Sequence, residues 1–254
     1  MRAWRVHALG EPEEVLRLDD VEPPVPASGE VLVAVDAASL NFPDVLVCRG
    51  QYQERPPLPF TLGIEIAGKV VAAGDGVEIP IGQRVMAMPT LPRGGLAEQV
   101  VIPARDALPI PDWVPSDQAA ALLITYQTGY FALHRRAGIR RGETLLVHGG
   151  AGGVGSAAIQ LGAAAGARVL AGATGPEHAA VCRQLGAQRA IDYRAEDFVR
   201  VVKEVTDGKG ADVIVDPVGG DMFDRSRRCI AFEGRLVVIG FASGRIAELP
   251  AKHA

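Results

Sequence analysis

The chain has 254 residues, enough for one large or two modest domains, and its 48% hydrophobic content is ample for a buried core. A net charge of −4 without a block of basic residues argues against a nucleic-acid-binding surface. The three cysteines are far apart in the sequence, which excludes a paired-cysteine zinc motif and fits a reducing compartment.

Neither a signal peptide nor a membrane span is predicted. Residues 1–6 lead into a polar stretch without the apolar segment of a signal peptide. The longest apolar stretch, 119–133, is interrupted by polar residues and falls short of the ~20 apolar residues that cross a bilayer. We therefore expect a cytoplasmic protein with no membrane partner.

The first half of the chain has the pattern of a β domain. Short β-like runs at 30–35, 66–71 and 99–102 are separated by proline and glycine. This pattern is typical of an irregular, mostly antiparallel β domain, expected over 1–116. A cluster of prolines ends the region, and Ser116 or Asp117 is expected to cap a helix that begins at Gln118.

The second half, 117–254, alternates between strand and helix patterns. The candidate strands are 144–148, 168–171, 189–191, 211–216 and 235–239, and the candidate helices are roughly 154–165, 177–185, 195–206 and 221–230. This alternation predicts an α/β fold with a doubly wound parallel sheet and right-handed crossovers. Five strands are one fewer than a complete Rossmann sheet contains.

A glycine-rich turn joins the first of these strands to the first helix. Gly150, Gly152 and Gly155 have the G-x-G-x-x-G spacing of a dinucleotide-binding turn. The first glycine allows a sharp turn, the second allows backbone to approach a pyrophosphate, and the third lets the helix pack on the strand. Gly153 and Val154 lie at the helix N-terminus, which attracts phosphate. The alternative is a β–α turn that binds nothing.

Several segments in order carry a resemblance to a known family. They are 41–44, 47–52, 59–68, the glycine turn, 216–220 and 240–245. With them the chain resembles the zinc-independent quinone oxidoreductases of the medium-chain dehydrogenase/reductase superfamily. The resemblance implies a GroES-like β domain followed by a Rossmann domain.

Family members continue for several dozen residues beyond the segment that corresponds to 245–250. The resemblance therefore implies a C-terminally truncated chain with an incomplete Rossmann sheet. Relatives form homodimers, and we expect this chain to lack their usual dimer edge, to be less stable and to be a weak catalyst.

The resemblance also bears on zinc. Alcohol dehydrogenases of the superfamily carry Cys in place of Asn41 and a Gly-His-Glu segment in place of Gly63-Ile64-Glu65. Neither Asn41 nor Ile64 is a good zinc ligand, so no metal is expected. Hydride donation to a quinone or an electron-poor double bond remains feasible without a Lewis acid, because the cofactor supplies the chemistry.

Three residues are candidates for catalysis: Asn41, Tyr52 and Thr128. Asn41 is expected to donate a hydrogen bond to a substrate carbonyl or, alternatively, to cap the local backbone. Tyr52 resembles the family's active-site tyrosine, a proton donor or oxygen anchor, although Leu46 replaces the second tyrosine that relatives often carry. Thr128, like Asn41, is expected near the nicotinamide, and its alternative role is a satisfied core hydroxyl. Glu65 is expected to be structural, and Asp44 to cap a helix.

The end of the second strand indicates the cofactor. Residues 170–175, which include Thr174, lack the acid that binds the ribose hydroxyls of NAD, so NADPH is favoured. Tyr193 and Arg194 resemble the family's phosphate-side contacts. His178, a weaker base than the usual lysine, makes the expected preference for NADPH modest. Glu177 lies just too late for the usual ribose position, but a shifted loop would restore the use of NADH. Gly240 and Phe241 follow the fifth strand, where ligands bind an open α/β sheet.

The predicted function is NADPH-dependent reduction of a small-molecule quinone or related α,β-unsaturated carbonyl. An enoyl-thioester reductase is one alternative, but Arg49, Arg55 and Arg93 are too sparse to form a groove for the phosphates of coenzyme A. A nucleotide-binding sensor or scaffold with little turnover is the other. The scattered histidines, His148 among them, have no expected catalytic role.

Overall fold

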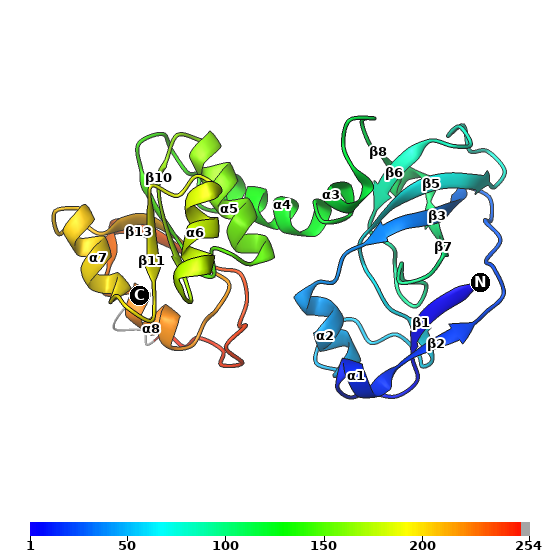
Figure 1. Cartoon of the computed structure of the whole chain (residues 1–254), viewed down its shortest axis with the longest axis horizontal. Coiled ribbons are helices and arrows are strands. Elements are labelled where there is room, and N and C mark those ends of the chain that lie inside the picture. Colours follow the sequence, from blue (N-terminus) through cyan, green and yellow to red (C-terminus); the bar gives the residue numbers. More distant parts are fainter. Residues whose placement is uncertain (250–254) are drawn as a thin grey trace. The chain divides into compact units, whose positions relative to one another are not determined.

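The computed structural model describes residues 1–249 of the chain, so the end of the predicted second domain, 250–254, lies outside the described part. Its contacts divide the chain into two compact units, Met1–Ile124 and Thr125–Ala254 (Figure 1). Helix α4 (Leu123–Tyr130) contains this division, whereas the boundary expected after residue 116 lies at helix α3 (Ser116–Ala120).

The first unit is built from two small sheets with antiparallel pairing. One has the order β2-β1-β4, with β1 (Arg2–Val6), β2 (Leu16–Asp20) and β4 (Phe60–Thr61). The other has the order β7-β3-β5-β6-β8, with β3 (Glu30–Ala38), β5 (Ile66–Ala73), β6 (Arg84–Ala87), β7 (Gln99–Pro103) and β8 (Leu108–Pro109). Two short helices, α1 (Pro12–Val15) and α2 (Phe42–Cys48), and the 3₁₀ turn Ala104–Asp106 complete this unit with α3. The predicted antiparallel β domain is confirmed.

The start of α3 differs from the prediction. Pro115 is the N-cap residue, and no side chain caps the helix. The Ser116 hydroxyl instead donates to Asp36 Oδ2 at 3.1 Å. The helix begins two residues earlier than predicted, so neither Ser116 nor Asp117 is its N-cap, although Asp117 Oδ1 accepts from Gln118 N at 2.9 Å.

The second unit contains a parallel five-stranded sheet with the order β11-β10-β9-β12-β13. Its strands are β9 (Thr144–Val147), β10 (Arg168–Ala173), β11 (Arg189–Asp192), β12 (Ala211–Asp216) and β13 (Ile230–Val238). Its helices are α5 (Gly153–Ala164), α6 (Pro176–Gln184), α7 (Phe198–Val205) and α8 (Asp221–Ser226), preceded by α4 and the π-helical segment Phe131–Arg136. The predicted doubly wound sheet is confirmed, and its strand order reverses at β9, between β10 and β12.

The residues of β9 are buried throughout, as expected for a central parallel strand that is covered on both faces. Leu145 and Val147 pack in one core cluster with residues of α5 and α6. Leu146 points to the other face and packs with Phe198 and Val202 of α7. Alternate residues of one strand thus anchor both helical layers.

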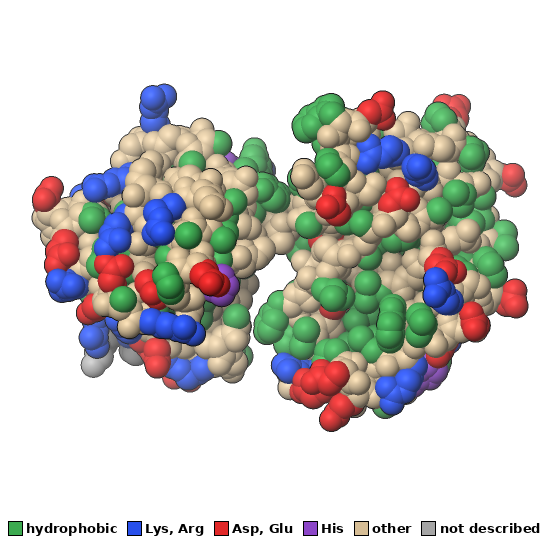
Figure 2. Space-filling model, in the orientation of Figure 1, with side chains coloured by type: hydrophobic (Ala, Val, Ile, Leu, Met, Phe, Trp, Pro, Cys, Tyr) green, Lys and Arg blue, Asp and Glu red, His purple; other side chains and the backbone are tan. Residues whose placement is uncertain are grey.

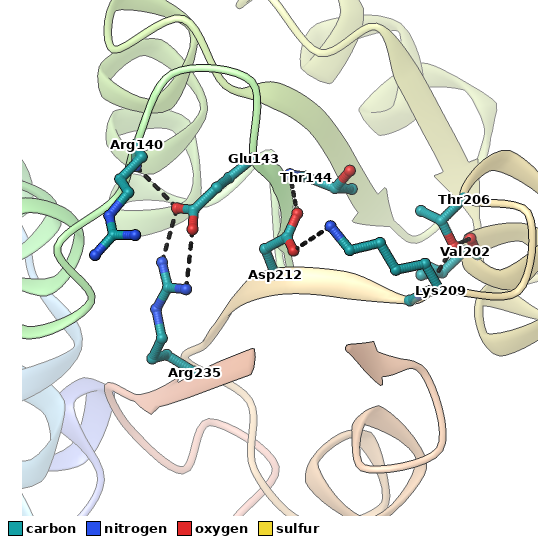
Figure 3. Close-up of polar contacts among 9 residues, drawn as sticks. Arg140, Glu143, Thr144, Val202, Thr206, Lys209, Asp212 and Arg235 are labelled. Carbon is teal, nitrogen blue, oxygen red and sulfur yellow. Dashed lines mark hydrogen bonds and ion pairs between the residues drawn. The ribbon is translucent and has the colours of Figure 1, made fainter. Parts of the chain in front are cut away.

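A polar network connects the amino ends of β9 and β12 to Arg235 in β13 (Figure 3). Arg235 donates two hydrogen bonds to the Glu143 carboxylate, at 3.0 and 2.7 Å, and a third to the Ala137 carbonyl at 3.0 Å. Asp212 accepts from Thr144 N at 2.8 Å and pairs with Lys209 at 2.8 Å. The network lies at the sheet edge opposite the carboxyl ends of the strands.

The last strand and last helix differ in length from the prediction. Strand β13 begins at Ile230 rather than at 235, and α8 ends at Ser226 rather than at 230. Glu233, with φ 60°, lies within β13, and the pairing register with β12 shifts between Ala211 and Val213. An irregular strand of this kind interrupts the alternation on which the sequence prediction depended.

Acidic and basic side chains are interspersed over the visible surface of each unit (Figure 2). None of the helices within residues 1–249 is long and apolar enough to cross a membrane.

Candidate functional site

The glycines of the turn after β9 have different structural roles from those predicted. The positive φ of the turn, 59°, belongs to Gly149, not to Gly150. A Cβ on Gly150 would lie 2.7 Å from Cys182 Sγ, and one on Gly155 would lie 2.1 Å from the Gly149 carbonyl oxygen. Gly150 and Gly155 therefore allow close packing, and the sharp turn depends on Gly149.

Gly152 is the N-cap of α5 and has one open side. A Cβ at Gly152 would approach only the Gly149 carbonyl oxygen, at 3.3 Å. The first hydrogen bond of the helix runs from Ser156 N to Gly152 O, at 2.8 Å. The backbone N–H groups of Gly153, Val154 and Gly155 are therefore without helical partners, and the helix dipole adds partial positive charge there. An anionic group would be stabilised at this position.

A groove of about 540 Å³ lies at the carboxyl edge of the parallel sheet, beside this turn. Its lining residues are Gly149, Ala151, Gly152, Ala173, Thr174, His178, Tyr193, Val218 and Met222. Four of the predicted cofactor residues, Gly152, Thr174, His178 and Tyr193, are among them. The other predicted cofactor residues of this unit, Thr128, Gly150, Gly153, Val154, Gly155, Gly240 and Phe241, do not line it.

The loop after β10 is held by the end of β11. Asp192 Oδ1 accepts from Gly175 N at 2.7 Å and from Arg194 N at 3.0 Å, and these bonds lower the pKa of the Asp192 carboxyl. His178 is exposed and contacts the Thr174 carbonyl through Nδ1, at 2.9 Å. Within residues 1–249 the Arg194 guanidinium has no ion pair, and its Nη1 would lie 3.6 Å from a Cβ on Gly175. A cation without a short ion pair in the described residues therefore lies next to this loop, attracted at longer range by the Asp192 carboxylate.

Tyr193 belongs to a buried polar chain. Its hydroxyl lies 2.6 Å from His148 Nδ1, and His148 Nε2 lies 2.7 Å from Ser226 Oγ. His148 is fully buried, and desolvation lowers its pKa to about 3, so the imidazole is neutral near pH 7. Sequence reasoning gave His148 no role, because its partners are 45 and 78 residues away.

The loops after β12 and β13 contact each other beside the glycine turn. Asp216 Oδ1 accepts from Val218 N at 2.8 Å and Gly219 N at 2.9 Å, which shapes the first loop. A Cβ on Gly219 would lie 2.8 Å from Phe241, and Ala242 N donates to the Pro217 carbonyl at 3.1 Å. Phe241 thus packs on the loop whose Val218 lines the groove.

Val218 and Met222 are lining residues that sequence reasoning missed. The segment 216–220 contributed to the family resemblance, but no site role was assigned to it. The sequence did contain a signal for a site role of this segment. It follows a predicted strand, and the carboxyl ends of parallel strands share one edge of the sheet.

Thr128 lies on α4 with a half-buried side chain, and its hydroxyl has no hydrogen-bond partner within residues 1–249. It is therefore not the satisfied core hydroxyl of the alternative interpretation. A neighbouring threonine touches the glycine turn instead: the Thr125 methyl carbon would lie 2.8 Å from a Cβ on Gly153.

In the first unit, Asn41 is the N-cap of α2 and forms a capping box with Asp44, whose carboxylate accepts from Asn41 N at 2.8 Å. Its amide Nδ2 donates to Ser39 Oγ at 2.9 Å and to Glu65 Oε2 at 3.0 Å. A carboxylate only accepts, so the atom that faces Glu65 is the amide nitrogen. Both amide N–H groups are used inside the protein, and the predicted donation from Asn41 to a substrate carbonyl is not available in this arrangement.

The carboxylates of Glu65 and Asp44 stabilise the region around the start of α2 in the first unit. Glu65 is fully buried and also accepts from Ile124 N at 2.9 Å, which ties it to the start of α4. Asp44 is buried as well, and desolvation raises the pKa of its carboxyl. These contacts fit the structural role expected for Glu65 and the helix-capping role expected for Asp44.

Tyr52 packs against a core cluster that contains Val47 and Phe60, and its hydroxyl has no hydrogen-bond partner within residues 1–249. Hydrophobic side chains gather around α2 on the face shown in Figure 2. The exposed hydrophobic residues in and beside α1 and α2 are Leu9, Leu40, Phe42 and Leu58. Tyr52 thus offers a free phenol in a largely apolar region.

A metal-ligand set is not found in the described part of the chain: residues 1–249 contain no group of three or more His, Cys, Asp or Glu side chains that could hold an ion. At the two positions compared with zinc ligands, the Asn41 amide is committed to Ser39 and Glu65, and Ile64 is aliphatic. These residues do not fit a zinc ion.

Two family models match the chain. The alcohol dehydrogenase GroES-like domain matches residues 27–112, and the zinc-binding dehydrogenase domain matches residues 153–254. The ranges fall in the first and second units, respectively.

Curated relatives and solved structures are similar along most of the chain. A quinone oxidoreductase-like protein 2 homolog of Nematostella vectensis is 42% identical over 88% of this chain, and the Bos taurus quinone oxidoreductase-like protein 2 is 38% identical over 98%. The chain spans 61% and 72% of the length of these relatives. The crystal structure of Escherichia coli quinone oxidoreductase complexed with NADPH has a TM-score of 0.91 at 34% identity, covering 99% of this chain and 77% of that one.

Proposed function

Because this chain belongs to the quinone oxidoreductase-like branch of the medium-chain dehydrogenase/reductase superfamily, we propose that it is an NADPH-dependent reductase of quinones or related α,β-unsaturated carbonyls that works without zinc. The main support for this proposal is the groove beside Gly152. There, backbone N–H groups without helical partners at the start of α5 lie next to the open side of a glycine, at the carboxyl edge of the sheet.

The chain's residues would hold the cofactor in three places. The pyrophosphate would accept hydrogen bonds from the N–H groups at the start of α5, over the open side of Gly152. The adenosine end would lie by Thr174 and His178. Arg194, free of any ion pair in the described residues, would supply the positive charge that a 2′-phosphate needs. Asp192, which holds this loop, is committed to two backbone N–H groups, which supports NADPH over NADH.

NADPH, when bound, supplies the hydride. The nicotinamide end of the site would be formed by Gly240 and Phe241 and by the free hydroxyl of Thr128. The packing of Phe241 on Gly219 supports this assignment, because it holds the aromatic ring in one place.

On the substrate side, Tyr52 would anchor or protonate the acceptor oxygen, and the hydrophobic residues around α2 would favour an uncharged, planar acceptor. Asn41 would act indirectly, by holding the start of α2 and the Glu65 carboxylate. A quinone or enone satisfies these requirements, since it needs a hydride and a proton but no metal-bound alkoxide.

Of the three arginines that the enoyl-thioester alternative would need, only Arg55 is without an ion pair in residues 1–249. Arg49 pairs with Glu11 at 2.7 Å, and Arg93 pairs with Glu30 at 3.3 Å, so neither is free for the phosphates of coenzyme A. A nucleotide-binding sensor with little turnover would use the same groove as the reductase. Activity therefore has to distinguish the two.

A direct screen tests the proposal. The purified chain is assayed for NADPH and NADH oxidation, in parallel, with a panel of quinones, enones and enoyl-coenzyme A. We expect turnover with quinones or enones and a preference for NADPH. Turnover with enoyl-coenzyme A alone would favour the thioester reductase, and tight NADPH binding without any turnover would favour the sensor.

A further inference from the structure

Two backbone hydrogen bonds join the loop 217–220, which follows β12, to the loop 240–245, which follows β13. Ala242 N donates to the Pro217 carbonyl at 3.1 Å. Ser243 N donates to the Val218 carbonyl at 3.0 Å. The loop 240–245 is therefore shaped against the loop 217–220, and its position depends on that of its neighbour.

The side chains of the loop 240–245 lie directly on the backbone of the other loop. A Cβ at Gly219 would lie 2.8 Å from Phe241 Cδ1, and one at Gly220 would lie 2.8 Å from Ser243 Oγ. Both glycines have a positive φ, 68° and 55°, which residues with a side chain rarely adopt. The close contact between the loops therefore requires this pair of glycines in the left-handed conformation.

The Asp216 side chain holds the loop 217–220 from inside the protein. Its Oδ1 accepts from Val218 N at 2.8 Å and from Gly219 N at 2.9 Å. Asp216 is fully buried at the carboxyl end of β12, and its backbone carbonyl accepts from Ile239 N at 2.8 Å, just before the loop 240–245 begins. One residue thus binds the first loop through its carboxylate and the start of the second through its carbonyl.

Only one of the two carboxylate oxygens of Asp216 is used. Oδ2 is buried and has no hydrogen-bond partner within residues 1–249. Desolvation raises the pKa of this carboxyl, and a buried polar atom without a partner is unfavourable for stability. The contacts of Asp216 with the loop therefore come from Oδ1, and an Asn side chain offers the same acceptor oxygen.

We propose that Asp216 is a positioning residue for hydride transfer: by fixing the loop 217–220 it fixes the Phe241 loop, and with it the place of the nicotinamide. The proposal rests on the function proposed above, which puts the nicotinamide beside Gly240 and Phe241. A misplacement of about 1 Å can slow a reaction by about 100-fold. The adenosine end of the cofactor would bind elsewhere in the groove, beside Thr174 and His178, so Asp216 should affect the rate of the reaction more than the affinity for NADPH.

Rates and affinities measured on the same variants test the proposal. The rate is that of NADPH oxidation by a quinone in a single turnover, and the dissociation constant of NADPH comes from fluorescence titration. We expect Asp216→Ala to slow hydride transfer by about tenfold or more and to raise the dissociation constant by less than about threefold. Asp216→Asn should keep the wild-type rate within about threefold, because it retains the acceptor. Glu143→Gln, which weakens the opposite end of the same sheet, is the control for lost stability and should leave the rate unchanged.

Amide hydrogen exchange of the ligand-free protein gives a second readout that requires no turnover. We expect the segments 217–220 and 240–245 to exchange faster by about tenfold or more in Asp216→Ala, and at the wild-type rate in Asp216→Asn and Glu143→Gln. Gly219→Ala would push the Phe241 ring directly and should loosen 240–245 in the same way. It provides the test if Asp216→Ala does not fold.

The outcomes separate this inference from the proposed function. A wild-type rate in Asp216→Ala, equal losses in Asp216→Ala and Asp216→Asn, or unchanged exchange of 240–245 would overturn the inference and leave the proposed function intact. Failure of the wild type to oxidise NADPH with any quinone or enone would overturn both, whereas the exchange rates would still show whether Asp216 fixes the Phe241 loop.

Discussion

At the scale of single residues, Gly152 and Gly155 lie in one turn, yet an added methyl group would meet different surroundings at each. At Gly152 it would point to the open side, with only the Gly149 carbonyl oxygen nearby at 3.3 Å. At Gly155 the same oxygen would be 2.1 Å away. Backbone dihedrals of −82° and 172° at Gly152 suit any residue. A methyl group at Gly152 should therefore leave stability unchanged, whereas one at Gly155 should lower it.

We predict that Gly152→Ala folds normally and loses NADPH affinity by about tenfold or more, because the methyl group occupies the space that the pyrophosphate needs. Fluorescence titration and thermal unfolding measure the two effects. Gly155→Ala is the matched control: overpacking against backbone costs about 1–3 kcal/mol and lowers its melting temperature. Unchanged NADPH affinity in Gly152→Ala would contradict the site assignment.

The Asn41 amide leads to a second prediction at this scale. Asn41→Asp would place a carboxylate against the buried Glu65, so one of the two carboxyl groups would have its pKa raised above the unfolded value. The resulting penalty, about 2 kcal/mol or more, is present above that raised pKa and disappears as the pH falls below it.

Urea unfolding of Asn41→Asp at pH 7 and pH 5 should therefore show a smaller loss of stability at pH 5. Asn41→Ala removes the same hydrogen bonds without adding charge, so its loss should be similar at both pH values. An equal pH dependence of the two variants would argue against the contact with Glu65.

Among the secondary-structure elements, the two ends of the parallel sheet have different roles. The carboxyl ends of the strands carry the groove, whereas the amino ends are fastened by Glu143, Arg235 and Asp212 (Figure 3). The hydrogen bond from Arg235 lowers the pKa of the Glu143 carboxyl. The Arg235–Glu143 pair joins β13 to the segment just before β9.

We predict that Glu143→Gln lowers the free energy of unfolding by about 1–2 kcal/mol at pH 7. The folded pKa of Glu143 lies below its unfolded value, so this stabilisation is present above about pH 4.3 and is lost as the pH falls through the folded pKa. The difference between wild type and variant should therefore shrink in acid.

Glu204→Gln is the control, because Glu204 forms an exposed pair with Arg200 on α7 and such pairs contribute about 0.3–0.5 kcal/mol. Denaturant titrations at several pH values compare the variants. A Glu143→Gln variant as stable as Glu204→Gln would show that the network does not hold these strands.

Most elements could be predicted from the sequence, because hydrophobic periodicity is a local signal. The strands of the parallel sheet and the turn to α5 were located within a few residues, except where β13 departs from regular pairing. The hydrogen bonds between side chains could not be predicted. Glu65 is 24 residues from Asn41, and His148 is 45 residues from Tyr193, so their hydrogen bonds exist only after the chain folds.

At the scale of the whole molecule, the proposed site residues are divided between the two units. Asn41 and Tyr52 belong to the first unit, and Thr128 and the nucleotide groove belong to the second. The matched domain descriptions include a zinc-binding dehydrogenase, whereas the positions compared with zinc ligands carry Asn41 and Ile64. We therefore expect this chain to reduce its acceptor without a metal.

We predict that the purified chain contains much less than one zinc ion per molecule and that chelation leaves its reductase activity unchanged. Elemental analysis and assays before and after treatment with a strong chelator provide the measurement. About one zinc per chain, together with loss of activity on chelation, would contradict the donor-set argument.

An isotope measurement tests whether a hydride passes from NADPH to the acceptor. The chelator-treated chain is given a quinone and either NADPH or NADPH deuterated at both C4 positions of the nicotinamide, and the rate of cofactor oxidation is followed in a single turnover. We predict quinone-dependent oxidation that is slower with the deuterated cofactor and that, at subsaturating NADPH, is slower by about tenfold or more in Gly152→Ala. Tight binding of NADPH without any oxidation by quinones or enones would contradict it.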